Sequence, residues 1–268
     1  QGLCDLLFAR MSTRTTSLRA KGHDLDHLNP CLTQEGVLVG LARLTRLEHL
    51  DLSQCSLIHT PTLDALQTLN RLTTLHLSEC HRLTSVRCLA QVTSLQTLCI
   101  DYCTQLRDVS SLGSLTSLTS LGLRHCPLAK FEDLCLRKCL RLRFIDLSCN
   151  FNLGSVADLL PRGTALEAVL LDSCIGLDAD DVSCALRHAC RLRQLDVAWC
   201  RHIPADIPAT VRSLRASVAE FASLGHLLEL RSYKVDSCIR SIGDRLSSLP
   251  LATLGHLELH RCDNMLEF

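Results

Sequence analysis

The chain has 268 residues, a length that suits one or two ordinary domains or one elongated array of repeats. Its formal net charge is zero and its pI is about 7.2, which removes the usual electrostatic argument for binding nucleic acid and gives no support for attraction to an anionic membrane. Hydrophobic residues make up 47% of the chain but aromatic residues only 3%, so the core must be aliphatic.

Residues 1–40 come before the first clear periodic pattern, and we expect them to form a helical or irregular N-terminal cap with one degenerate repeat near Leu18. The short apolar stretch at residues 3–9 has no basic residue before it and no clear cleavage site after it, so it lacks the features of a secretory signal peptide. No apolar run approaches the roughly 20 residues that a membrane-spanning helix needs.

A nine-residue pattern of leucines and a cysteine dominates residues 41–268. Leu72, Leu75, Leu77 and Cys80 occupy its first, fourth, sixth and ninth positions. The same pattern starts at Leu47, Leu72, Leu95, Leu118, Leu142, Leu166 and Leu192, at intervals of 23–26 residues, and again at Leu230 and Leu254. A degraded copy with Val211, Leu214 and Ala216 fits the longer interval after Leu192. Regular self-similarity of this kind indicates a repeat protein rather than a globular domain.

This pattern resembles that of the leucine-rich repeat family, and the resemblance covers roughly residues 40–268. It implies an α/β solenoid, or horseshoe, with one short parallel β-strand per repeat lining a concave face. We expect about ten units over residues 41–268, joined by helical, 3₁₀ or extended convex segments. The leucines then point into a core that neighbouring repeats share, so that no repeat folds alone.

The segments between the patterns differ in their predicted structure. Residues 61–72 and 178–192 have the spacing of amphipathic helices, the second with acidic residues in its first turn. Residues 84–95 and 108–118 are short and rich in Ser and Thr, which predicts a single helical turn or a 3₁₀ segment. Residues 200–214 contain Pro204 and Pro208, so we expect a tight, non-helical connection there.

The ninth position raises the question of whether its cysteines do chemistry. In the leucine-rich repeat family an asparagine at this position binds the backbone of the neighbouring repeat, and a small buried thiol can replace it. Asn150 takes this place in the middle of the array. We therefore predict a structural ladder of Cys55, Cys80, Cys103, Cys126, Asn150, Cys174, Cys200, Cys238 and Cys262. Stacked buried thiols favour a reducing, intracellular compartment, with the cytoplasm or cytoskeleton ahead of the mitochondrion.

Strand alternation places the third, fifth and seventh positions on the concave face, with the eighth at its rim. An acidic band and a few aromatic side chains fall at these positions, a combination typical of protein-binding hot spots. The alternative is a solvated acidic face with its aromatic rings packed on neighbouring repeats. The predicted partner-binding residues are Tyr102, Arg124, His125, Phe144, Asp146, Asp172, Asp196 and Trp199.

Catalytic and metal-binding patterns are weak. His49, His76 and Cys99, or His256 and His260 around Glu258, could in principle converge on a metal, and Cys99 near His76 is the one candidate nucleophile on the concave face. The chain has no C-x-x-C pair and no Gly-rich phosphate-binding loop. We therefore predict no catalytic residues, no metal and no cofactor.

Basic residues gather at the edge that precedes the strands, in the runs at residues 137–143 and 187–193. The simplest interpretation is a solvated edge. The alternative is a contact with RNA or an acidic protein inside a larger assembly.

The preferred function is a non-enzymatic protein–protein interaction module, a scaffold or structural subunit of a larger intracellular complex. The units with cysteine at the ninth position are similar to those of F-box-type ubiquitin-ligase adaptors, and the Ser/Thr-rich units to leucine-rich repeat proteins of trypanosomatids. The alternative function is therefore a substrate receptor of a ubiquitin ligase. That alternative requires an F-box helix bundle, whose Leu-Pro motif residues 1–18 lack.

Overall fold

The computed structural model describes residues 14–19, 40–55, 58–128, 133–157, 159–161, 165–200, 204, 206–216, 224–236, 250 and 252–260. The chain divides into two compact units, Gln1–Leu142 and Arg143–Phe268. No helix among the described residues is long and apolar enough to cross a membrane.

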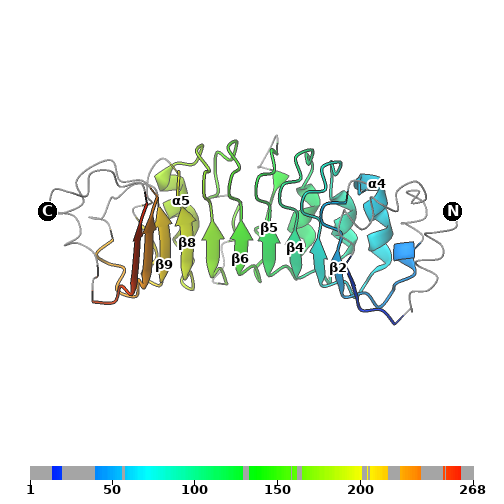
Figure 1. Ribbon diagram of the computed structural model, residues 1–268, viewed down its shortest axis with the longest axis horizontal. Coiled ribbons are helices and arrows are strands. Elements are labelled where there is room, and N and C mark those ends of the chain that lie inside the picture. The colour runs from blue at the N-terminus through cyan, green and yellow to red at the C-terminus, as the bar shows by residue number, and fades with distance from the viewer. Residues whose placement is uncertain are drawn as a thin grey trace. The chain divides into compact units, whose positions relative to one another are not determined.

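Each unit is a stretch of leucine-rich repeat solenoid, with one short parallel strand per repeat (Figure 1). The first unit contains β1 Ser17–Arg19, β2 His49–Asp51, β3 Thr74–His76, β4 Thr97–Cys99 and β5 Ser120–Gly122. The second unit contains β6 Phe144–Asp146, β7 Ala168–Leu170, β8 Gln194–Val197, β9 Ser213–Ala216, β10 Ser232–Val235 and β11 His256–Leu259. Within each unit the strands follow chain order, which confirms the predicted fold class.

The degenerate repeats predicted at two places both contribute a strand. Leu18 in β1 lies opposite Leu50 in β2, and Leu214 in β9 lies opposite Leu195 in β8. Strands align in register because a core leucine at the fourth position of one repeat packs on its equivalent in the next. The proposed boundary between a cap and the solenoid at residue 40 stays a prediction.

The leucine positions form the core. Leu72, Leu75 and Leu77 are fully buried, while Thr74 and His76, which alternate with them, are half-buried on the opposite face of the strand. Each buried leucine contributes about 1.5–3 kcal/mol of transfer free energy. We call the face that points away from this core the strand face.

The convex segments are shorter than the longest helices predicted. They are α4 Thr60–Leu63, η1 Asp64–Thr68, η2 Arg87–Gln91, η3 Ser110–Ser114 and α5 Ala179–Leu186. The 3₁₀ predictions for residues 84–95 and 108–118 are confirmed by η2 and η3. In the tight connection at 200–214, the described residues before β9 form no helix.

The prediction of continuous helices over residues 61–72 and 178–192 is wrong at their C-terminal ends. The structure has one α-helical turn and a 3₁₀ segment in the first case, and a helix that stops at Leu186 in the second. The backbone N–H of Ala189 bonds the carbonyl of Leu186, and that of Leu192 bonds the carbonyl of Ala189. Core residues spaced by three, rather than by the 3.6 of an α-helix, require these tight turns so that each side chain faces the core.

The chain leaves each strand from β2 to β8 through a residue in the left-handed conformation at the eighth position of the repeat. The residues are Gln54, Glu79, Tyr102, His125, Cys149, Ser173 and Trp199, with φ between 52° and 63°. None of them is a glycine, and a residue with a Cβ atom is less stable in this left-handed conformation than in the right-handed one. Backbone hydrogen bonds hold the turn, as when the N–H of Gln54 donates to the carbonyl of Ser78 in the next repeat at 2.7 Å.

Candidate interaction surface

The predicted cysteine ladder joins each repeat to the one before it. In five repeats, the thiol at the ninth position donates to the carbonyl at the sixth position of the preceding repeat. The bonds run from Cys80 to Leu52, Cys103 to Leu77, Cys126 to Ile100, Cys174 to Leu147 and Cys200 to Leu171, at 3.1–3.3 Å. The carbonyls of Leu52, Leu77 and Leu171 also accept the backbone N–H of the ninth residue of their own repeat, so the ladder thiol is a second donor that comes from the next repeat.

Two members of the predicted ladder make other contacts, and two lie outside the described residues. The amide of Asn150 donates to the carbonyl of Leu147 in its own repeat at 2.7 Å, and Cys55 lies 3.8 Å from the carbonyl of Ser53. Cys238 and Cys262 lie outside the described residues.

Burial keeps the ladder thiols protonated. It raises the pKa of Cys80, Cys103, Cys126 and Cys200 to about 12, and raises that of Cys174 further. Because the thiolate is the nucleophilic form, these cysteines act as hydrogen-bond donors rather than as reactive groups. All thirteen cysteines in the described ranges are free thiols.

On the strand face of the first unit, Asp101 organises a polar network. One of its carboxylate oxygens accepts the backbone N–H of Arg124 at 2.8 Å, and the other accepts the thiol of Cys99 at 3.0 Å. The Cys99 sulfur also lies 3.1 Å from the hydroxyl of Ser78. Burial, and then the bond to Asp101, raise the pKa of Cys99 to about 11, so this thiol is not an activated nucleophile.

Three predicted partner-binding residues lie at the ends of β4 and β5. The rings of Tyr102 and His125, both left-handed eighth-position residues, lie with centroids 5.4 Å apart and planes tilted by 34°. Tyr102 is 39% exposed, whereas Arg124 and His125 are half-buried. The structure therefore brings these three side chains to the same rim of the first unit.

The other five predicted residues lie in the second unit. Phe144 and Asp146 are half-buried in β6, and Trp199 is 40% exposed after β8. The carboxylate of Asp146 accepts the N–H of Ser148 at 2.9 Å, and that of Asp196 accepts the N–H of Ala198 at 3.0 Å. Asp146 and Asp196 thus also stabilise the turn that follows their own strand.

Arg215, which the sequence prediction missed, links the acidic residues of the second unit. Its Nη1 lies 3.1 Å from Asp196 and 3.4 Å from Asp172, and its Nη2 lies 2.5 Å from Asp236. Burial raises the pKa of Asp196. The signal was present, since Arg215 stands between Leu214 and Ala216 in the degraded repeat and so must face away from the core.

Two exposed apolar residues were also missed. Phe151 and Ile175 are each 52% exposed and directly follow Asn150 and Cys174, the ninth positions of adjacent repeats. A Cβ on Gly176 would lie 3.3 Å from the carbonyl oxygen of Phe151, so the two turns are in contact. Both residues hold the tenth position of their repeats, which the sequence shows, but the prediction considered only the strand-face and rim positions.

The basic edge is partly neutralised in the second unit. Arg143 forms bonds of 2.7 and 2.9 Å through Nη2 to the two carboxylate oxygens of Glu167. Arg212, which lies outside the two basic runs, pairs with Glu229 at 2.9 Å. Exposed ion pairs of this kind contribute at most about 1 kcal/mol.

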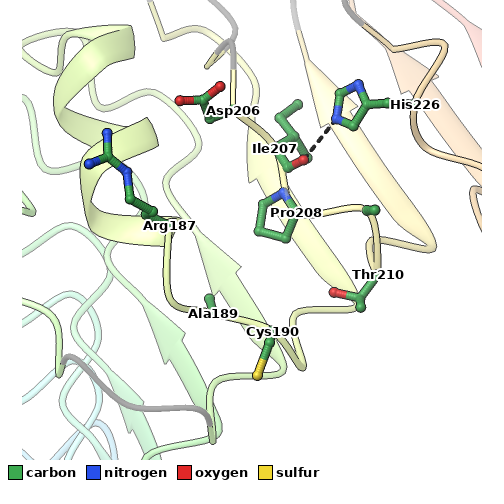
Figure 2. A pocket seen from close by; sticks show the side chains of 9 residues that line it. Arg187, Ala189, Cys190, Asp206, Ile207, Pro208, Thr210 and His226 are labelled. Atoms are coloured by element: carbon green, nitrogen blue, oxygen red, sulfur yellow. Dashed lines mark hydrogen bonds between the residues drawn. The ribbon is translucent and has the colours of Figure 1, made fainter.

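A pocket of about 490 Å³ opens beside the end of α5 (Figure 2). It is lined by Arg187, Ala189, Cys190, Asp206, Ile207, Pro208, Ala209, Thr210 and His226. His226 Nε2 lies 2.8 Å from the carbonyl of Ile207. None of the predicted partner-binding residues lines this pocket.

Several of the residues considered for metal binding, Cys99 and Glu258 among them, form other contacts. Glu258 pairs with His260 and lies 3.4 Å from Lys234, and the hydrogen bond from His260 lowers the pKa of Glu258. Throughout the described ranges, no three His, Cys, Asp or Glu side chains form a group that could hold a metal ion.

Comparisons with known proteins agree with this architecture. A family model described as Leucine Rich Repeat matches residues 46–69. No curated protein matches the sequence. The fold is similar to that of an internalin (inlF) from Listeria monocytogenes, with 17% identity, a TM-score of 0.59, and coverage of 98% of this chain and 89% of the internalin.

Two further solved structures are similar at the level of the fold. A leucine-rich repeat protein of Leptospira interrogans has 14% identity and a TM-score of 0.50, with 92% of this chain and 78% of that protein covered. A TDR receptor has 15% identity and a TM-score of 0.60, with 95% of this chain but only 44% of the receptor covered. The strand in each repeat, the leucine core and the matched repeat at residues 46–69 together show that the chain folds as a leucine-rich repeat solenoid.

Proposed function

We propose that this chain is a non-enzymatic protein–protein interaction module that binds a partner on its strand face. The observation that carries the proposal is the placement of Tyr102 and Trp199. Both are large, exposed at 39% and 40%, and held at left-handed backbone positions by the repeat. Amphipathic rings on a rigid turn lose little conformational entropy when they bind, which makes them suitable anchors.

The role within the cell is a scaffold or structural subunit of a larger intracellular complex, cytoskeletal or organellar. Free thiols throughout the described cysteines support a reducing compartment. The ladder thiols are protonated, and the thiol of Cys99 is hydrogen-bonded to Asp101. These observations support a non-enzymatic role, because none of these cysteines is an activated nucleophile. Turnover in a panel of hydrolase and GTPase assays would contradict that role.

The test is affinity purification of the tagged protein under gentle lysis, with mass spectrometry of its stoichiometric partners. Tyr102→Ala with Trp199→Ala should remove those partners. Leu140→Ala is the matched control, because Leu140 is 60% exposed but precedes the core position Leu142 and lies off the strand face. Partners that stay with the double variant would show that these residues are not the anchors. A cullin and its linker protein among the partners would instead favour the ligase receptor.

A further inference from the structure

The strand face of the second unit is acidic although the whole chain has no net charge. Its described third, fifth and seventh positions carry five carboxylates, which we call the acidic strip: Asp146, Asp172, Asp196, Asp236 and Glu258. They carry only two cations, Arg215 and Lys234, so the formal charge is −3 with histidine neutral. The same positions of the first unit balance, with Arg19 and Arg124 against Asp51 and Asp101.

Both cations at these strand-face positions already form ion pairs. Arg215 is shared among three carboxylates at 2.5–3.4 Å, and Lys234 lies 3.4 Å from Glu258. Asp172 and Asp236 are about nine-tenths buried, so water screens their charges poorly. The strip therefore presents an uncompensated negative potential that a cation from another molecule would stabilise.

An apolar ridge borders this strip on the side where the strands end. It consists of Phe151, Ile175 and Trp199, which are 52%, 52% and 40% exposed. They follow β6, β7 and β8, respectively. Asp146 lies in β6, Asp172 comes two residues after β7, and Asp196 lies in β8. Phe151 and Ile175 hold the tenth position of adjacent repeats whose turns are in contact, and Trp199 holds the eighth position of the repeat that follows. Aromatic residues make up only 3% of the chain, and two of them are placed on this ridge.

We propose that the partner of the second unit is a cationic peptide segment whose Arg or Lys side chains reach the acidic strip while its apolar side chains cover the ridge. This inference rests on the proposed function and names the chemistry of the partner. Charge complementarity selects a basic segment and disfavours both an acidic peptide and a nucleic acid, which the strip would repel. Burying the ridge supplies affinity that charge alone does not, because exposed ion pairs are weak.

The test uses the full chain and a fluorescently labelled peptide in which arginine alternates with leucine. Two comparison peptides replace every arginine by glutamate or every leucine by serine. In fluorescence anisotropy the arginine–leucine peptide should bind, more tightly at low salt than at high salt. Both comparison peptides should bind at least about tenfold more weakly, a difference of about 1.4 kcal/mol.

Variants then separate the ridge from the strip. Phe151→Ser with Ile175→Ser should weaken binding about tenfold, whereas Leu228→Ser, at a residue 69% exposed in the same unit, should not. Asp146→Asn removes one charge but keeps an oxygen that can accept the N–H of Ser148, so it should lower affinity and its salt dependence without loss of fold. Circular dichroism of each variant checks the fold.

Equal binding of the glutamate peptide, preference for single-stranded RNA, or affinity unchanged in the ridge variant would each overturn the inference. The proposed function fails separately, when the Tyr102 and Trp199 double variant keeps its native partners. If the double variant loses those partners but the unmodified chain does not bind the arginine–leucine peptide, the chain has an interaction surface that recognises another chemistry.

Discussion

The carboxylate of Asp101 occupies the space that a side chain on Gly122 would need. A Cβ at Gly122 would lie 2.8 Å from one carboxylate oxygen of Asp101 and 3.1 Å from the sulfur of Cys99. Because Gly122 has no side chain, Asp101 reaches across to the N–H of Arg124 in the next repeat. A bond between repeats on the strand face thus depends on the size of one residue in β5.

Gly122→Ala should therefore lower the free energy of unfolding by about 1–3 kcal/mol, because the new methyl group displaces Asp101 and breaks its bond to Arg124. Urea denaturation followed by circular dichroism measures the change. Gly154→Ala is the matched control, since a Cβ there meets nothing within 4 Å and neither glycine has a positive φ. Equal stability of the two variants would show that Asp101 accommodates the methyl group.

Removal of a ladder thiol should destabilise the fold even though the thiol is not reactive. Cys103→Ala removes the 3.2 Å bond from the thiol to the carbonyl of Leu77, which keeps the backbone N–H of Cys80 as a second donor. The loss of this one hydrogen bond should cost about 0.5–1.5 kcal/mol. Cys190→Ala, at an exposed cysteine, should change stability by less than about 0.5 kcal/mol. Thermal and urea unfolding under reducing conditions compare the two. A Cys103 variant as stable as the Cys190 variant would mean that the ladder bond contributes nothing.

The buried thiols also predict a loss of stability at alkaline pH. The pKa of Cys126 is about 12 in the folded chain against an ordinary value of 9.0, so above pH 9 the unfolded chain releases a proton that the folded chain keeps. The contribution of this thiol to the free energy of unfolding is fully present below about pH 9. It falls as pH rises toward 12, by up to about 1.4 kcal/mol per pH unit.

Urea titrations in steps of pH, with reductant present, measure this slope. Cys126→Ala should make the slope shallower, whereas Cys135→Ala, at an exposed cysteine, should leave it unchanged. A slope that is the same in all three proteins would mean that other groups govern the alkaline transition.

The left-handed turn after each strand makes its own prediction. Gln54 is exposed with φ of 63°, so Gln54→Gly should leave stability unchanged or raise it by up to about 1 kcal/mol. Gln54→Val should destabilise by about 1–2 kcal/mol, because a branched Cβ is disfavoured in this conformation. Gln96→Val, at an exposed glutamine without a positive φ, is the control and should be nearly neutral. Equal effects of the two valine substitutions would remove the backbone explanation.

Much of the fold could be predicted from the sequence because the repeat is a local signal. The pattern of Leu72, Leu75 and Leu77 recurs at nearly constant intervals, and each copy places apolar side chains at equivalent positions of the shared core. Even the degraded copies near Leu18 and Leu214 form strands, since their neighbours supply both the hydrogen-bond partners and the packing surface. The ends of α5 and of the 61–72 segment were less predictable, because apolar residues spaced by three fit both a helix and successive tight turns.

The candidate site was predicted only as a set of positions. The sequence alone determined that Asp172, Asp196 and Trp199 stand at strand-face or rim positions, because alternation along a strand decides which side chains leave the core. Only the tertiary structure decided that Arg215 joins Asp172, Asp196 and Asp236 and that Asp101 fills the space above Gly122. These contacts join residues 19 to 43 positions apart in the chain, and distances across repeats are set by the stacking of the core rather than by any local pattern.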